Sequence, residues 1–288
     1  YRTPYWIPDP HNIYHDEGEP YNGFHPTFDT DIFDNTIVVG TRGQKRGWNF
    51  DVSQVFGSNA VDYTVHESLN TDMGAESPTT FRVGGYEFGH QVTDLDLARR
   101  IYNASVAMGA EFRVENFRAK AGEEASYIGS GTQSFPGLQP QNEIDANRYN
   151  VGIYTDIAVD ISDELLVGGA ARFENYSDFG DNTTWKLNGR YKLLDENGAL
   201  RLAASTGFRA PSLHQIYLSN IQTLISGGTV SNQGTFNNES TVLRALKVAQ
   251  LKEENAFNIT AGVTLRPRPA LFLSLDVYQV DVDDRIVY

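Results

Sequence analysis

Two pairs of residues in this sequence have spacings that occur in metal-binding or reactive sites. His11 and His15 lie four residues apart, so on a helical turn both imidazoles would share one face and could hold a metal ion. Two prolines stand just before His11 and favour a loop, so a plain surface loop is the preferred interpretation. Ser212 and His214 lack an acidic partner at a suitable spacing. The sequence therefore predicts no catalytic residue, no enzyme activity and no cofactor.

Three side chains are candidates for contact with a ligand. Arg209 stands at the end of an expected strand, on the same polar face as Arg201 and Ser205. It could contact an anionic ligand, although an ion-pair ladder along a sheet is the more common use of such an arginine. His214 and Tyr217 follow within a long polar connection. We treat Arg209, His214 and Tyr217 as the ligand-binding candidates.

Composition excludes several classes of protein. The formal net charge of −14 argues against nucleic acid as a partner, because nucleic-acid binders present basic faces. No apolar run approaches the roughly 18 residues that a membrane helix requires. The chain has no cysteine, which excludes disulfides and thiolate metal sites. Its 26 glycines and 12% aromatic residues fit an all-β protein with polar loops, either in a membrane or as a secreted sandwich.

Strict alternation of apolar and polar residues predicts the strands that would position these candidates. Between residues 149 and 160 one face consists of Tyr149, Val151, Ile153, Ile157 and Val159. Period two places such a set on one side of a strand, and each segment has roughly the length of a tilted membrane strand. The same pattern recurs at residues 48–52, 106–114, 165–173, 183–193, 200–208, 256–266 and 271–277. The opposite face mixes full charges with glycine, which is typical of a wet lumen.

The connections between these segments alternate in length. Tight links at 43–46, 161–163, 195–197 and 266–269 alternate with long ones at 67–90, 119–147 and 210–255 and with a shorter one at 177–182. Short turns at one end and long loops at the other are the outer-membrane pattern. The alternation also predicts that residues 57–59 form no hairpin, but a bulge within one strand over 47–66. We therefore expect an antiparallel transmembrane β-barrel segment of about ten strands, with short periplasmic turns and long extracellular loops.

The two ends of the chain fall on the side of the long loops. We expect residues 1–35 to be an extracellular loop and residues 36–288 to be barrel strands and loops of one domain. Bacterial barrels begin and end on the periplasmic side, so we expect this chain to form part of a larger barrel. The segments at 37–42 and 270–283 should then be unpaired edges of an open, curved sheet.

Four segments carry a resemblance to a known family. Residues 205–213 (STGFRAPSL) resemble a segment of TonB-dependent receptor barrels in which a strand enters a long external loop. Residues 172–180 (RFENYSDFG) resemble an earlier strand end of that family. Residues 251–255 (LKEEN) resemble its LKPE segment, with Glu254 and Asn255 in place of an acid–threonine pair. Residues 275–286 resemble a strand ending in a DDRI-like element, and the clear resemblance covers residues 112–288.

The resemblance implies a function. A complete receptor of this family resembles a roughly 22-stranded barrel around a plug. Neither the plug nor a TonB-binding box is recognised in this chain. The implied function is TonB-dependent import of a scarce nutrient across the bacterial outer membrane, with a ferric siderophore as the leading ligand. The implied partners are TonB with its inner-membrane energising complex, the small-molecule ligand, and outer-membrane lipid and lipopolysaccharide. The alternatives are a passive porin-like or surface-binding barrel without TonB coupling, and a soluble secreted β-sandwich.

The expected sidedness is directly testable. Protease added to intact cells should cut within the long links at 67–90, 119–147 or 210–255, because these face the medium. It should spare the turn at 195–197, which the alternation places in the periplasm. Cleavage confined to the short turns, mapped by mass spectrometry of the fragments, would invert this topology.

Overall fold

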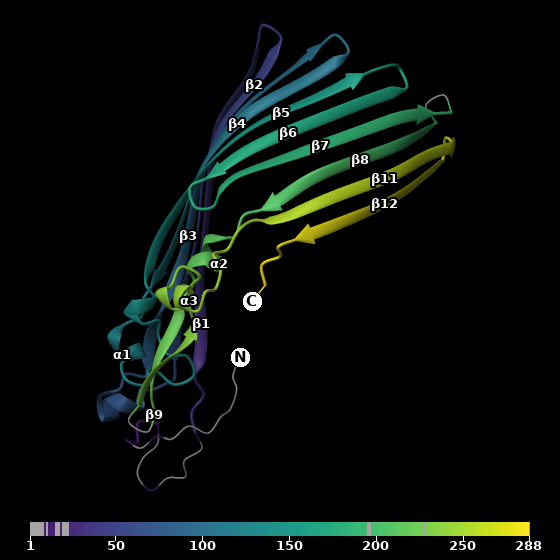
Figure 1. Ribbon diagram of the computed structural model, residues 1–288. Helices are drawn as coiled ribbons and strands as arrows, with labels where there is room; N and C mark the ends of the chain where they lie inside the picture. Colours follow the sequence, from purple (N-terminus) through teal and green to yellow (C-terminus); the bar gives the residue numbers. More distant parts are fainter. Residues whose placement is uncertain are drawn as a thin grey trace.

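The protein is a single large antiparallel sheet with loops gathered at one end (Figure 1). The computed structural model describes residues 9, 11–14, 18, 23–194, 197–226 and 229–287, and side chains outside 222–232. The strands of the sheet are β1 (Thr27–Lys45), β2 (Trp48–His66), β3 (Thr80–Ile101), β4 (Ala104–Lys120), β5 (Ile144–Asp160), β6 (Leu165–Tyr176), β7 (Gly180–Leu193), β8 (Gly198–Arg209), β11 (Glu254–Arg268) and β12 (Leu271–Asp283). The loops contain the hairpin β9 (Asn220–Ser226) and β10 (Thr229–Thr235), and the short helices η1 (Thr71–Glu76), α1 (Glu124–Tyr127), η2 (Pro140–Asn142), α2 (Leu213–Tyr217) and α3 (Thr241–Ala245).

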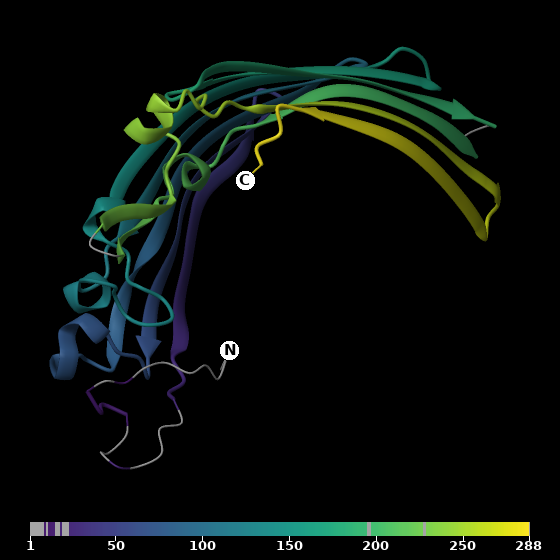
Figure 2. The same cartoon turned by 60° about the horizontal axis from the view of Figure 1, so that its bottom comes forward.

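Each strand pairs with its sequence neighbours, and the sheet stays open. The order is β1-β2-β3-β4-β5-β6-β7-β8-β11-β12, with every pair antiparallel. Figure 2 shows the sheet curved into an arch. Within the described residues β1 and β12 have no partner on their outer sides, so the predicted unpaired edges and the ten-strand count are confirmed. A single curved layer is not a sandwich. Among the described residues no helix is long and apolar enough to cross a bilayer.

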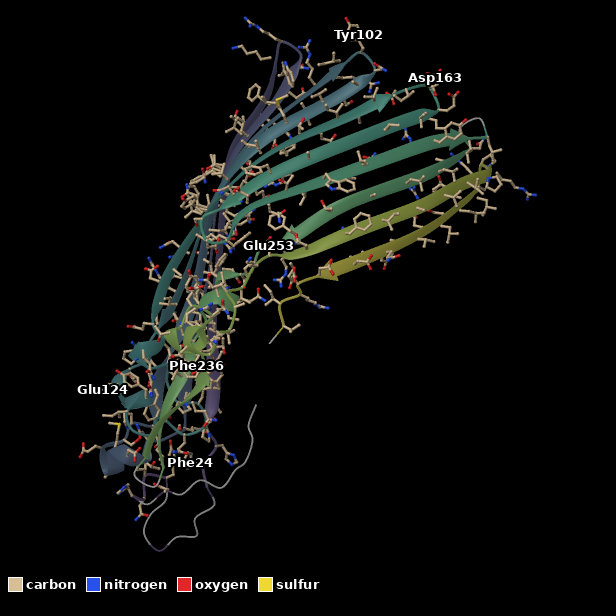
Figure 3. The ribbon with its side chains drawn as sticks, in the orientation of Figure 1. Phe24, Tyr102, Glu124, Asp163, Phe236 and Glu253 are labelled. Carbon is tan, nitrogen blue, oxygen red and sulfur yellow. The ribbon has the colours of Figure 1, made fainter. Side chains whose placement is uncertain are left out.

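The two ends of the sheet differ in the expected way. Tight turns join β1 to β2, β3 to β4, β5 to β6, β7 to β8 and β11 to β12. The long connections, 67–79, 121–143 and 210–253, all lie at the opposite end. Figure 3 shows this separation, with Tyr102 and Asp163 on turns at one end and Glu124 and Phe236 in loops at the other. The predicted segregation of short and long connections is therefore confirmed.

One face of the sheet carries an apolar belt that no described residue covers. Leu187 is 59% exposed and Leu202 is 65% exposed, which a soluble protein of one layer would not tolerate. We define the belt as the exposed outward-facing residues Tyr149, Val151, Ile153, Val167, Phe173, Trp185, Leu187, Tyr191, Leu200, Leu202, Phe257, Ile259, Leu275 and Val277. The other face carries charged side chains that reach across strands. Arg172 on β6 contacts Glu111 on β4, as side chains on the concave side of a curved sheet can.

Beyond the belt, toward the loops, the apolar residues of the strands lie on the inward face instead of the outward face. On β4 and β5 the outward positions become polar at Asn116 and Asp145, whose side chains lie 2.6 Å apart in a hydrogen bond. The inward positions become apolar, with Phe117 fully buried and Ala146 buried. This reversal marks the level at which the strands leave lipid, because the outward face then meets water. The inward face packs beneath the loops.

The reversal corrects the predicted bulge at residues 57–59. There is no hairpin there, as predicted, but β2 pairs with β1 in unbroken register from His66 to Trp48. The shift of the apolar set from Phe56 to Val65 is thus a change of face along a regular strand. The irregularity lies in β3 instead, opposite Tyr63 and Thr64, where Gly84 takes a φ of 105°. Glycine has no Cβ, so it tolerates this left-handed conformation.

Two other sequence predictions need correction. Residues 1–35 are not all loop, because β1 begins at Thr27 and runs to Lys45. The connection expected at 67–90 is shorter, since β3 starts at Thr80. Both corrections lengthen strands at the loop end. Within the 210–253 loop, α3 has only five residues and is capped by the Ser240 hydroxyl.

The long loops interlock around small cores. Val65, Phe81 and Val83 are fully buried, with Phe135 of the 121–143 loop packed against them. The buried Asn70 side chain donates to the carbonyl oxygens of Ala125 and Ile128, each at 2.9 Å. These bonds join the 67–79 loop to the 121–143 loop. The loops at the outer ends of β2 to β5 are therefore packed together and do not extend separately into solvent.

The belt predicts opposite responses to charge on adjacent residues. Leu187→Arg should lower the free energy of unfolding in lipid by ~2–4 kcal/mol, because Leu187 faces hydrocarbon. Asn188→Arg, one residue on and facing inward, should cost much less. Urea-driven unfolding of the intact receptor from lipid vesicles measures both. An equal loss of unfolding free energy in the two variants would indicate that both faces of the sheet are buried in protein.

Candidate functional site

The four sequence segments that carry the family resemblance meet at one level of the sheet. They lie at the ends of β6, β8 and β12 and at the start of β11, just beyond the belt. We call this level the outer rim. It is where the 210–253 loop leaves and re-enters the sheet. Arg209 hydrogen-bonds Glu254, the backbone N–H of Ile286 also donates to Glu254, and the Tyr176 ring packs edge-on against Phe208. These contacts give the motifs a physical role.

Arg209 and Glu254 form a two-pronged ion pair between the feet of the 210–253 loop. They are register partners on β8 and β11, with Nε to Oε2 at 2.8 Å and Nη2 to Oε1 at 2.5 Å. The backbone N–H of Ile286, beyond β12, donates to Glu254 Oε1 at 2.7 Å. These bonds from Arg209 and then Ile286 lower the pKa of Glu254 to about 2. The pair fixes both ends of the loop to the chain that follows β12.

Arg148 on β5 is the most buried charged side chain of the rim, at 6% exposed. Its Nε donates to Glu115 at 2.8 Å, and its Nη1 donates to the Pro211 carbonyl at 2.6 Å and to Asp178 at 3.4 Å. Its guanidinium also lies 5.4 Å from the centre of the Tyr176 ring. Two carboxylates, a carbonyl and a ring offset the cost of burying the charge. Arg148 thereby ties β4, β5, the end of β6 and the 210–253 loop together.

The start of the loop is a capped helical turn. The Ser212 hydroxyl accepts from the Gln215 N–H at 3.2 Å, and Gln215 Oε1 accepts from the Ser212 N–H at 3.0 Å. This capping box opens α2. Arg209 Nη1 also donates to Gln215 Oε1 at 3.2 Å. The Ser212 hydroxyl thus serves as a helix cap, consistent with the absence of a hydrolase arrangement in the sequence.

Helix α2 lies against the inner, concave face of the ten-stranded sheet, which we call the wall. Leu213 and Ile216 are buried, and the His214 ring packs on Phe117 of β4 with the ring centres 4.3 Å apart. The ring of Phe88 lies 5.6 Å away. Burial lowers the pKa of His214, so the imidazole is neutral at pH 7. The helix therefore lies over the inner surface at the loop end of the arch, which we call its mouth.

Tyr217 borders a small hollow beside α2. The hollow holds about 170 Å³ and is lined by side chains of the rim and of the 210–253 loop, including Asp178, Glu239, Gln250 and Lys252. Burial, together with the negative charges of Glu239 and Asp178, raises the pKa of the Tyr217 phenol. The phenol remains protonated at neutral pH. The structure thus places the three ligand candidates within one short segment but gives them different surroundings.

Of the two histidines near the start of the chain, the structure describes only His11. The His11 imidazole lies beside Gly74 of η1, where an added Cβ would be 3.5 Å from Nε2. His15 lies outside the described residues. No group of three or more histidine, aspartate or glutamate side chains arranged to hold a metal is present among the described residues.

Sequence reasoning missed Arg148 and Glu115. The available signal was their position, because alternation places both on the charged inner face of β4 and β5. Their partners, Asp178 and Pro211, come from distant segments, so no local spacing could show the cluster. Likewise, the docking of the 210–253 loop through Asn142, which exchanges hydrogen bonds of 2.8 and 3.0 Å with the backbone of Ile221, has no sequence pattern.

The fold is shared with solved siderophore receptors and with a peptide transporter. A mutant ferric enterobactin receptor (PfeA) of Pseudomonas aeruginosa is 15% identical, with a TM-score of 0.62 over 88% of this chain and 35% of that one. The siderophore receptor PirA of Acinetobacter baumannii is 15% identical, with a TM-score of 0.60 over 89% of this chain and 35% of that one. The RagAB peptide transporter is 8% identical, with a TM-score of 0.60 over 96% of this chain and 34% of that one.

The chain spans about a third of the length of these structures, and at such low identity the likeness concerns the fold alone. No curated protein sequence matches the chain. The family evidence is independent of the structures, because the sequence pattern described as "TonB dependent receptor-like, beta-barrel" matches residues 2–288. With that match over the whole wall, and with four motif segments joined at its rim, the chain belongs to the TonB-dependent receptor-like β-barrel family.

Proposed function

We propose that this chain is part of the wall of an outer-membrane receptor that imports a scarce nutrient with energy from TonB. The observation that carries the proposal is the family match over residues 2–288. The apolar belt supports a location in the bacterial outer membrane, where β-strands cross the bilayer as barrels. Import by such a receptor involves no covalent chemistry, so the chain has no catalytic role in this proposal.

The proposed ligand is a ferric siderophore. Support comes from solved siderophore receptors of the same fold, among them one in complex with enterobactin. The inward position of α2 is consistent with a ligand entering at the mouth of the arch. We assign Tyr217 to direct ligand contact, because it borders the hollow beside α2. Arg209 and His214 would position this segment, since each is already held by Glu254 or by Phe117.

Transport of a defined probe by the complete receptor tests the proposal. Cells that rely on this receptor should take up iron-labelled ferric enterobactin only when TonB is present. Deleting TonB, or collapsing the proton gradient, should abolish uptake without lowering the amount of receptor in the outer membrane. Unchanged entry of small solutes in cells without TonB would instead support the passive, porin-like alternative.

The rim cluster makes a second prediction. Arg148→Gln leaves Glu115 and Asp178 without their shared cation, and breaking a buried ion pair costs ~3–5 kcal/mol. The 210–253 loop should therefore detach from the wall, and external protease should cut it in intact cells faster than it cuts the same loop of the parent protein. Uptake of the ligand should fall in parallel, because α2 is no longer held at the mouth.

A matched variant lies on the neighbouring strand. Arg118→Gln also removes one cation, but Arg118 and its partner Asp145 are 47% and 55% exposed on the water-facing side. Exposed pairs contribute ~0–1 kcal/mol, so the 210–253 loop of this variant should be cut at the same rate as that of the parent. Equal protease sensitivity of the two variants would show that Arg148 does not hold the loop.

A further inference from the structure

Three cations lie together at the end of β1, β2 and β3 that carries the tight turns, opposite the mouth. Lys45 ends β1, Arg46 stands in the turn to β2, and Arg99 lies near the end of β3. The turn approaches β3 closely, because a Cβ added to Gly47 would lie 3.4 Å from Arg99 Nε. We call Lys45, Arg46 and Arg99 the basic patch.

The basic patch adjoins the outward, apolar face of the wall. Val52 and Leu95 are register partners on β2 and β3, and both are exposed on that face. Two steps of period two lead from this pair to Trp48 and Arg99, which therefore face outward as well. The Arg99 guanidinium lies 5.8 Å from the centre of the Trp48 ring, and Lys45 is the register partner of Trp48. Positive charge thus follows directly on the apolar surface.

The chain balances the charge on the other side of the same strand. Arg100, the residue after Arg99, faces the inside of the arch and pairs with Asp160 at 2.8 Å. On the outward side, no carboxylate among the described residues forms an ion pair with a member of the basic patch. The turn between β5 and β6, by contrast, carries Asp163 and Glu164 and no cation. The positive excess is therefore local, in a chain with 23 basic and 37 acidic residues.

Arg46 occupies a turn position whose geometry favours other residues. Because Lys45 pairs with Trp48, Arg46 and Gly47 form a two-residue hairpin turn, with φ of 51° and 80°. Such turns favour asparagine, aspartate or glycine at the first position, because a bulky side chain crowds the backbone at positive φ. The geometry of the turn therefore does not account for an arginine here, whereas its charge adds to that of Lys45 and Arg99.

The surroundings of the basic patch match the level of a bilayer at which head groups meet acyl chains. Tryptophan prefers this interface, because its ring is apolar and its N–H is polar. Lysine and arginine next to an apolar surface extend their charges toward the head groups, and a guanidinium can bind a phosphate through two parallel hydrogen bonds. We propose that the basic patch binds the phosphate of an anionic phospholipid, whose acyl chains lie against Val52 and Leu95. The inference requires the apolar face to lie in a bilayer and holds whether or not TonB drives transport.

Site-specific cross-linking to lipid tests the proposal in the complete receptor. The variant Ile101→Cys, labelled with a benzophenone, is placed in vesicles of equal amounts of phosphatidylethanolamine and phosphatidylglycerol. Ile101 ends β3 two residues beyond Arg99, so the irradiated label inserts into a C–H bond of a lipid at the basic patch. Mass spectrometry then gives the ratio of the two lipids in the adducts. Phosphatidylglycerol should exceed phosphatidylethanolamine about fivefold, which is the enrichment that one cation beside an anionic head group supplies.

A matched position lies on the acidic turn. Ile161 follows β5 and is exposed like Ile101, but Asp163 and Glu164 are close to it in the chain. The same label on Ile161→Cys meets the same vesicles without a basic patch beside it. Its adducts should therefore contain no excess of phosphatidylglycerol.

Neutralising the basic patch supplies the decisive comparison. Lys45→Gln, Arg46→Gln and Arg99→Gln, combined with the label on Ile101→Cys, should abolish the excess of phosphatidylglycerol. These side chains form no ion pair among the described residues, so the fold should be kept. The proposal is overturned if the excess is absent with the patch intact, persists after neutralisation, or is equally large at Ile161. A label on Ile101→Cys that forms no lipid adduct would overturn it as well, because the patch would then lie away from the head groups.

Discussion

The structure depends on one constraint, which is that a backbone N–H or C=O left without a partner in hydrocarbon costs several kcal/mol. Antiparallel pairing of neighbours along the chain satisfies this for every strand between β1 and β12. The two outer edges are satisfied only when other strands pair with them, which fits the β-barrel family to which the chain belongs. Because the wall is one layer thick, each side chain faces either lipid or the wet interior. Apolar and polar residues therefore alternate along each strand.

The change of medium at the outer rim explains where the charged clusters lie. Below the rim the outward face is apolar and the inward face is wet, as Leu187 and Asn188 illustrate. Above it the inward face becomes a packing surface for loops, as at Phe117. Charges that cross this level are paired tightly, with Arg148 between two carboxylates and Arg209 on Glu254. The family motifs occupy the positions where a loop must leave such a wall in a defined direction.

Period two made most of the wall predictable. It placed the strands from residue 47 onward, their two faces and the continuity of β2 through residues 57–59. It failed at the outer half of β1, where Asp29, Asp31 and Asp34 break the apolar alternation because that part stands in water. It also misread the change of face in β2 as a bulge. The rim cluster and the docking of the 210–253 loop were beyond sequence patterns, since their partners converge from separate segments.

The most direct test of this account is the accessibility of single spin labels along β5 in the complete receptor in lipid. The chain has no cysteine, so one cysteine at a time can be introduced and labelled. Contact with oxygen dissolved in the bilayer should alternate with period two from Tyr149 to Ile157, high at the outward positions. At Asp145 and Asn147, on the same outward side, oxygen contact should give way to contact with a water-soluble nickel reagent. High oxygen contact that continues through Asp145, or that is equal on both faces, would contradict the assignment of belt and rim.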